Sequence, residues 1–345
     1  NNNINLLNSY FFQYPGGDGY WYLFLGNLIS ENLKQFNIVE ALRGGKDIFY
    51  FMPGMRYFVG IEKLLFGNAY YLHLAVFSFL PFVLKKLLEL YLSKKITKIL
   101  MISFLFIPLM HHMGFSFFQY IRYASKVFAE PIAYTIFIYG FTRLVLFYKD
   151  KKFYIKSLPF TCLLLCISCI LRPNLSSSSF FLLLLPLFYL ILQKKIKILI
   201  YFLLCGTVIF LPLFHNYFFG NELILFTSAV FTDANIKITL TDYYNFLTNF
   251  NISNEKKIMI IEIIKNFFNP FEIHKYFIIL GVIYSLHYKN LKDNLILPIH
   301  ILIFSQFYLF LFLNPGPRYV WIFWLASLIL SLNMFLNLKF KRKRK

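Results

Sequence analysis

The sequence predicts an all-α fold: a polytopic membrane bundle of about nine transmembrane helices. Three observations predict it. Of the 345 residues, 59% are hydrophobic and only 14% are charged, whereas soluble proteins are about one-quarter charged. Long apolar runs recur between clusters of lysine. The basic residues gather in alternate loops, as they do in the cytoplasmic loops of membrane proteins.

The predicted membrane spans are apolar runs separated by loops that hold charged residues, glycine or proline. They lie near 70–91, 96–112, 127–148, 155–171, 176–192, 195–214, 274–288, 293–313 and 318–338. Some are shorter than the roughly 20 residues that a helix needs to cross the hydrocarbon core. We interpret 1–345 as a single transmembrane domain.

The positions of Lys and Arg predict the orientation. One set of loops holds most of them, accompanied only by the acids Glu89, Asp150 and Asp293, and the tail 339–345 is strongly basic. By the positive-inside rule, these loops and the C-terminus are cytoplasmic, and the tail contacts anionic lipids. The net charge of +20 is therefore a topology signal and does not indicate nucleic-acid binding.

Two segments on the non-cytoplasmic side are long enough to fold: a first outer loop, 1–68, and a later outer loop, 215–273. Each contains a stretch expected to form a helix in the membrane interface. The first, 19–30, is rich in Trp, Tyr and Leu, and the second, 255–268, has apolar residues around most of its circumference.

The candidate catalytic residue is Asp18, in Gly17-Asp18-Gly19 at the start of the first predicted interfacial helix. Its structural interpretation is a helix N-cap. Its functional interpretation rests on the aromatic residues around it, which would partly desolvate the carboxylate at the membrane surface. A partly desolvated carboxylate is suited to act as a general base.

Cationic residues also occur on the outer side, where positive charge is disfavoured: Arg56, Arg122, Lys126, Arg172 and Arg318. The structural interpretation is snorkelling, or ion pairs with Glu62 or Glu130. The functional interpretation is a cluster that binds phosphate, which suits the arginine fork. Pro53-Gly54, Pro173-Asn174 and Pro315-Gly316-Pro317 are expected to place three of the cations on irregular backbone. At membrane depth, such backbone lines protein or a wet cavity.

Other chemistries have no visible site. The sequence contains no P-loop, no dinucleotide glycine motif and no Asp-x-Asp pair. Cys162, Cys166 and Cys169 share one helical face in an apolar run, and packing is favoured over iron–sulfur ligation because no fourth thiol is near. His111-His112 have no carboxylate beside them, so packing is also favoured over metal binding there. We expect no cofactor, and no ligand set supports a divalent metal.

Several short motifs, in this order, resemble the membrane glycosyltransferases of the GT-C superfamily, which includes relatives of protein mannosyltransferases and of the lipid A aminoarabinose transferase. The similarity covers 10–175 well and the C-terminal third weakly. The motifs are Gly16-Gly17-Asp18-Gly19-Tyr20, Tyr50-Phe51-Met52-Pro53-Gly54-Met55-Arg56-Tyr57, Leu65-Phe66-Gly67, Ala129-Glu130-Pro131, Leu171-Arg172-Pro173-Asn174 and Pro317-Arg318-Tyr319.

The resemblance implies a sugar donor carried on polyprenyl or dolichyl phosphate, and an acceptor on the non-cytoplasmic face of, we expect, a bacterial inner membrane. Asp18 matches the first-loop acid that acts as the base or orients the acceptor. Members often have two adjacent acids here, so the second role is unassigned and metal dependence stays open. The expected substrate-binding residues are Arg56, Tyr57, Arg122, Lys126, Glu130, Arg172, Arg318 and Tyr319.

Two other functions stay open at this point. A lipid-linked glycan transporter, flippase or polymerase would use the same basic cavity without chemistry at Asp18. An ion-coupled transporter is less favoured, because it needs acids in the middle of its spans, whereas the acids here mostly fall in loops or at helix ends.

A cytoplasmic tail after an odd number of crossings places residue 1 outside, yet nothing in 1–8 could carry the first loop across a membrane. The first loop of GT-C proteins also follows a first helix. We therefore expect one more apolar helix, of roughly 20 residues with Lys or Arg before it, directly upstream of Asn1. The upstream genomic sequence checks this, and a stop codon or polar stretch just before Asn1 would contradict it.

Overall fold

The computed structural model describes residues 17–46, 48–49, 52–106, 116–229, 235–239, 295–312 and 321–342, with isolated positions between 261 and 283. The described residues fold almost entirely as helices, as the sequence predicts, with one short antiparallel strand pair. The helices are α2 (Gly17–Lys34), α3 (Ile38–Arg43), α4 (Pro53–Phe66), α5 (Tyr71–Ser78), α6 (Leu80–Tyr91), α7 (Lys94–Phe106), α8 (Phe117–Ser125), α9 (Ala129–Lys149), α10 (Lys151–Tyr154), η2 (Ile155–Ser157), α11 (Leu158–Leu171), η3 (Pro173–Leu175), α12 (Ser176–Leu192), α13 (Ile196–Gly206), η4 (Thr207–Phe210), α14 (Leu211–Gly220), α19 (Leu297–Phe312) and α20 (Trp321–Arg342).

Five helical runs in the described part of the chain are long and apolar enough to cross a membrane. They coincide with predicted spans, and the last extends six residues beyond its predicted end. Several such helices in one chain fit an integral, multi-pass membrane protein. The runs are Tyr71–Tyr91, Ala129–Lys149, Lys151–Leu171, Pro173–Leu192 and Ile196–Gly220.

The other predicted spans are matched less fully. Helix α7 has 13 residues, short for a crossing. Helices α19 and α20 are apolar and cover most of the predicted 293–313 and 318–338. The predicted 274–288 lies largely outside the described residues. The total of nine crossings stays a prediction.

Helix α9 lies at the centre of the bundle. In the most apolar 18-residue stretch of α9, 72% is buried inside the protein. In the corresponding stretch of the run Ile196–Gly220, only 11% is buried. A helix that is apolar around its whole circumference and buried is a core helix, and α9 packs mainly on α11 and α6. The run Ile196–Gly220 instead presents its apolar side chains outward, as a lipid-facing helix does.

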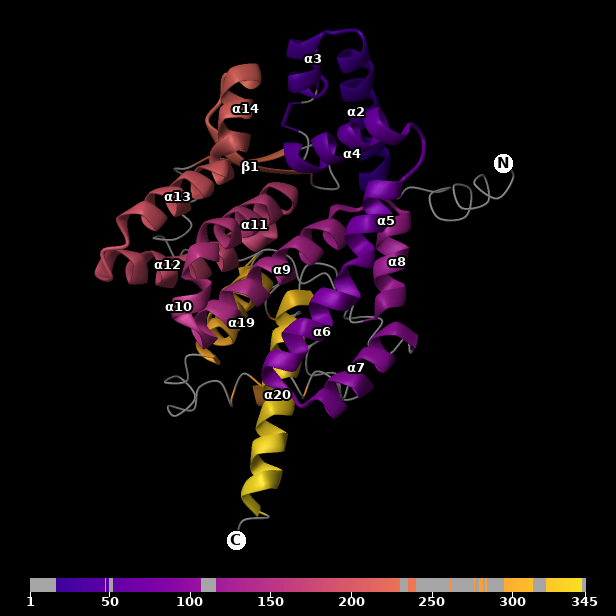
Figure 1. The fold of residues 1–345 in the computed structure, drawn as a ribbon. Coiled ribbons are helices and arrows are strands. Elements are labelled where there is room, and N and C mark those ends of the chain that lie inside the picture. The colour runs from indigo at the N-terminus through magenta and orange to yellow at the C-terminus, as the bar shows by residue number, and fades with distance from the viewer. Residues whose placement is uncertain are drawn as a thin grey trace.

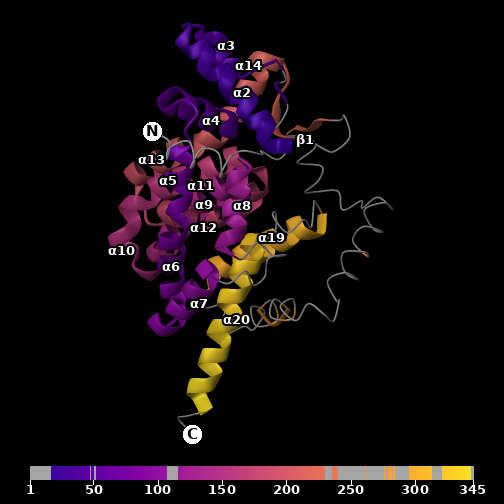
Figure 2. The ribbon, with the colours of Figure 1, turned by 90° about the vertical axis from the view of Figure 1, so that its right-hand side faces the viewer.

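The first outer loop caps one end of this bundle. Helices α2, α3 and α4 lie with α14 and β1 (Ile224–Ala229) at the end opposite the C-terminus of α20, and the side view agrees (Figures 1 and 2). The interfacial stretch predicted at 19–30 is helical, within α2. The helix predicted at 255–268 lies outside the described residues.

The later outer loop begins differently from its prediction. Residues 215–220 belong to α14, and after them β1 pairs antiparallel with β2 (Asn235–Thr239), with Ile224 opposite Thr239. The sequence analysis predicted no strand here, because a single short hairpin leaves little periodic signal.

Helices α2 and α4 make the most extensive contact of the outer end, and two glycines allow it. A Cβ atom at Gly26 would lie 2.4 Å from Val59 Cγ1, and one at Gly60 would lie 2.8 Å from Ile29 Cγ2. Both distances are too short for real side chains, so the backbones approach closely only because neither residue has a Cβ. This contact holds α2, with Asp18 at its start, against α4.

We expect Gly26→Ala to destabilise the protein by about 1–3 kcal/mol, because the added methyl forces Val59 and the α2–α4 contact to shift. Thermal unfolding in detergent measures the change. Gly17→Ala is the matched control, since nothing lies within 4 Å of a Cβ at Gly17. Equal unfolding temperatures for the two variants would contradict the close contact.

Candidate functional site

Charged residues from separate segments of the chain influence the buried phenol of Tyr22. Tyr22 lies one turn after Asp18 on α2 and is 2% exposed. Burial is the main cause that raises the pKa of its phenol. Arg172 and Arg56 lower this pKa, whereas Glu130 and Asp18 raise it. Four of the predicted site residues therefore influence this one pKa, and two of them, Glu130 and Arg172, are in direct contact.

Glu130 and Arg172 form an ion pair. Arg172 Nη2 donates to Glu130 Oε1 at 2.6 Å, and both residues are buried. Glu130 lies in the first turn of α9. Arg172 has extended backbone between the end of α11 and η3, so the predicted irregular backbone around Pro173 is confirmed. The pair joins the outer ends of α9 and α11.

Arg56 is fully buried, and its Nη2 donates to the Ile48 carbonyl oxygen at 3.2 Å. The expected irregular backbone at Pro53-Gly54 is wrong: α4 begins at Pro53, so Arg56 lies in its first turn. Proline fits this position because its missing N–H would have no helical partner there. A Cβ at Gly54 would lie 2.7 Å from the Ile170 oxygen, so this glycine lets α4 approach the end of α11.

Asp18 is half-buried in the first turn of α2. The sequence predicts Asp18 as the residue before the helix, whereas in the structure Asp18 is the second residue of α2. A carboxylate in the first turn still interacts favourably with the helix dipole. The structural and functional interpretations of Asp18 are therefore compatible.

The other described candidates are Tyr57, Arg122 and Lys126. The Tyr57 hydroxyl donates to the Leu42 carbonyl oxygen and ties α4 to α3, and burial raises the pKa of Tyr57 to about 12. Arg122 is exposed on α8, and Lys126 is half-buried just after it. Arg318 and Tyr319 lie outside the described residues.

A polar network extends from the Arg172 turn into the bundle. Asn174 Nδ2 donates to the Tyr134 hydroxyl at 3.2 Å. Gln306 Nε2 donates to the Asn174 carbonyl oxygen at 3.3 Å and to Ser178 Oγ at 2.7 Å. The Ser178 and Ser305 hydroxyls are 2.8 Å apart. These contacts link η3, α12 and α19 and hold the turn in an otherwise apolar interior.

Sequence reasoning missed Tyr22 and this network. Tyr22 stands four residues after Asp18, on the same face of a helix, and that spacing could have identified it. Gln306 and Ser178 are 128 residues apart in the sequence, so no local pattern connects them.

Within the part of the chain that the structure describes, no group of three or more His, Cys, Asp and Glu residues could hold a metal ion. Cys162, Cys166 and Cys169 are buried free thiols on α11. His111 and His112 lie outside the described residues.

Comparison with protein-family models, curated proteins and solved structures gives no match. The support for a function therefore comes from the geometry and chemistry of the residues around Tyr22.

We expect Glu130→Gln or Arg172→Gln alone to destabilise the protein by about 3–5 kcal/mol, because each leaves a buried charge without its partner. The double variant should recover part of this loss, since it removes both charges. Unfolding free energies of the four proteins form a double-mutant cycle. Strictly additive losses would show that the two side chains are not coupled.

Proposed function

We propose that the protein is a membrane glycosyltransferase of the GT-C type. It moves a sugar from a polyprenyl-phosphate carrier to a lipid, glycan or protein acceptor on the non-cytoplasmic face of a bacterial inner membrane, with the C-terminus cytoplasmic. The main support is that Asp18, Arg56, Glu130 and Arg172 all influence the pKa of one buried residue, Tyr22, and that Glu130 and Arg172 form a direct ion pair. Asp18 and the two arginines were selected from the sequence on different grounds, and the four residues come from four segments of the chain.

In the proposed reaction, Asp18 takes the proton of an acceptor hydroxyl. The acceptor oxygen attacks the anomeric carbon of the sugar and inverts it, and the bond from that carbon to the phosphate oxygen breaks. The lipid phosphate leaves with the electron pair. Positive groups placed where this charge develops stabilise the transition state, and Arg56 and Arg172 are suited to that role.

Glu130 has a positioning role in this scheme. Its ion pair holds the Arg172 guanidinium at the outer end of α11, and fixed donors cost little reorganisation during a reaction. The guanidinium has five N–H donors in a planar fork, a geometry that suits the oxygens of a phosphate. Tyr22, beside them, has a hydroxyl that burial keeps protonated.

The location also supports a site at the membrane surface. Helices α2 and α4, which carry Asp18 and Arg56, lie at the end of the bundle away from the C-terminus of α20 (Figure 2). The predicted cytoplasmic position of the basic tail then places this end on the non-cytoplasmic side.

We expect Asp18→Asn to lower sugar transfer about a hundredfold or more, because the amide cannot accept the proton. Membranes that contain the variant, supplied with radiolabelled polyprenyl-phosphate sugars, measure this. Lys341→Ala is the control and should keep its activity, since other basic residues of the tail surround Lys341. Undiminished transfer by Asp18→Asn would remove the catalytic role and favour a transporter or polymerase.

A further inference from the structure

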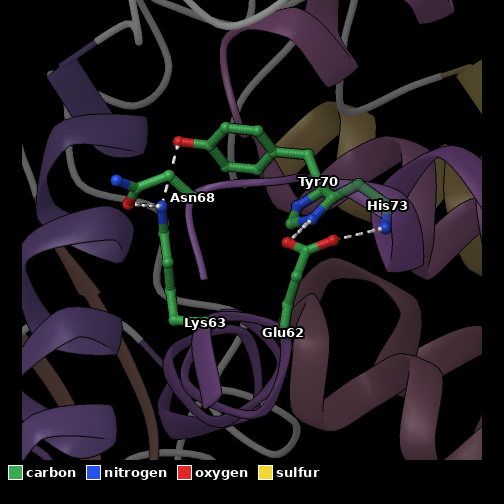
Figure 3. A network of polar contacts seen from close by, with 5 residues as sticks. All are labelled: Glu62, Lys63, Asn68, Tyr70 and His73. Carbon is green, nitrogen blue, oxygen red and sulfur yellow. Dashed lines mark hydrogen bonds and ion pairs between the residues drawn. The ribbon is translucent and has the colours of Figure 1, made fainter. Parts of the chain in front are cut away.

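A second charged cluster lies at the corner between α4 and α5, apart from the residues around Tyr22 (Figure 3). Glu62 and Lys63 stand near the end of α4. Asn68 and Tyr70 lie in the connection, and His73 lies in the first turn of α5. The sequence analysis considered only Glu62, as a partner for an outer cation. The structure gives this carboxylate a different partner.

Glu62 is occupied by His73. Its Oε1 accepts from the His73 backbone N–H at 2.8 Å, and its Oε2 contacts His73 Nδ1 (Figure 3). Both side chains are fully buried. The first backbone N–H groups of a helix need acceptors from outside the helix, and Glu62 supplies one for α5. This pair fixes the corner and turns the Glu62 carboxylate toward α5.

Lys63 is left with neutral partners. It is 7% exposed, and its Nζ donates to Asn68 Oδ1 at 3.2 Å and to the Tyr70 hydroxyl at 3.5 Å. The ammonium also lies 4.6 Å from the centroid of the Tyr70 ring. Among the described residues, Lys63 forms no ion pair with a carboxylate. A buried ammonium held only by neutral groups is stabilised by an anion.

The charge of Lys63 is sensitive to its surroundings. Burial, the larger effect, lowers the pKa of Lys63, and the nearby Glu62 carboxylate raises it. An anion at Nζ would favour the protonated form further. A lysine on the predicted non-cytoplasmic side is itself unusual, so this one requires a compensating partner.

Exposed apolar side chains occur on the same two helices as the polar cluster. Asn68 is exposed, so the cluster reaches the surface, and the span Tyr71–Tyr91 begins immediately after it. An exposed apolar patch of this kind at the end of a membrane span faces lipid. The exposed apolar residues are Ile61, Leu64, Leu65, Phe66 and Tyr71.

We propose that the α4–α5 corner binds an anionic phospholipid, with its phosphate at Lys63 Nζ and its acyl chains along the exposed apolar residues of α4 and α5. The Asn68 amide has N–H donors in addition to the oxygen that Lys63 uses, so it can bond a phosphate oxygen. The site is separate from the residues around Tyr22, so it stands whether or not the protein is a glycosyltransferase.

Native mass spectrometry of the purified protein tests this, with phosphatidylglycerol and phosphatidylcholine added separately. The wild type should retain one phosphatidylglycerol at concentrations where phosphatidylcholine does not bind. Lys63→Gln should weaken that binding about tenfold, because a charge-assisted contact is lost. Lys63→Arg should keep it. Lys85→Gln is the matched control, because Lys85 is 60% exposed and pairs with Glu89.

Asn68→Asp gives a second test that does not remove a buried side chain. The new carboxylate would neutralise Lys63, so phosphatidylglycerol binding should fall as it does in Lys63→Gln. Unchanged binding in either variant would overturn the proposal. The last experiment adds inorganic phosphate as a competitor. If it displaced phosphatidylglycerol at equal concentration, the acyl chains would contribute nothing to the binding affinity, and the assignment of a lipid would be wrong.

Discussion

The buried ion pair between Glu130 and Arg172 is the constraint on which the outer end of this bundle depends. Two charges removed from water cost several kcal/mol each, and only close pairing with further polar contacts offsets that cost. The pair joins the start of α9, the central helix, to the end of α11. It stands beside the irregular turn at Pro173, whose own polar groups are bonded to α9, α12 and α19. Apolar packing alone would not fix this turn.

The second requirement is that α2 lies over this pair. The close contact between α2 and α4 at Gly26 and Gly60 sets the position of α2, and the contact of Gly54 with α11 sets that of α4. Tyr22 and Asp18 then share one environment with Arg56 and Arg172. Two further charged residues, Asp18 and Arg56, influence the pKa of the same buried tyrosine as the ion pair does. The proposed binding site rests on that observation.

The sequence predicts the parts of this arrangement that have local signals. The apolar runs predict the five helices that are long and apolar enough to cross a membrane, and short motifs single out Asp18 and Arg172 as candidates. Arg56 was expected on irregular backbone but lies in the first turn of α4, because Pro53-Gly54 reads equally well as a turn or a helix start. The pairing of Glu62 with His73 could not be predicted, because either Glu62 or its neighbour Lys63 could have faced α5. Tertiary contact, not local pattern, decides which one is buried with a partner.

Helix α4 carries two buried cations, and their positive charges have different neighbours. Arg56, in its first turn, shares the surroundings of Tyr22 with the carboxylates of Asp18 and Glu130. Lys63, in its last turn, has only neutral hydrogen-bond acceptors. An anion that enters near Arg56 must compete with carboxylates already present, which suits a phosphate that is bound and then released. An anion at Lys63 meets a nearby carboxylate, Glu62, but one that is already bonded to His73. Lys63 therefore offers a bound anion an ammonium whose direct partners are neutral, and that difference between the two ends of α4 is what the two proposals use.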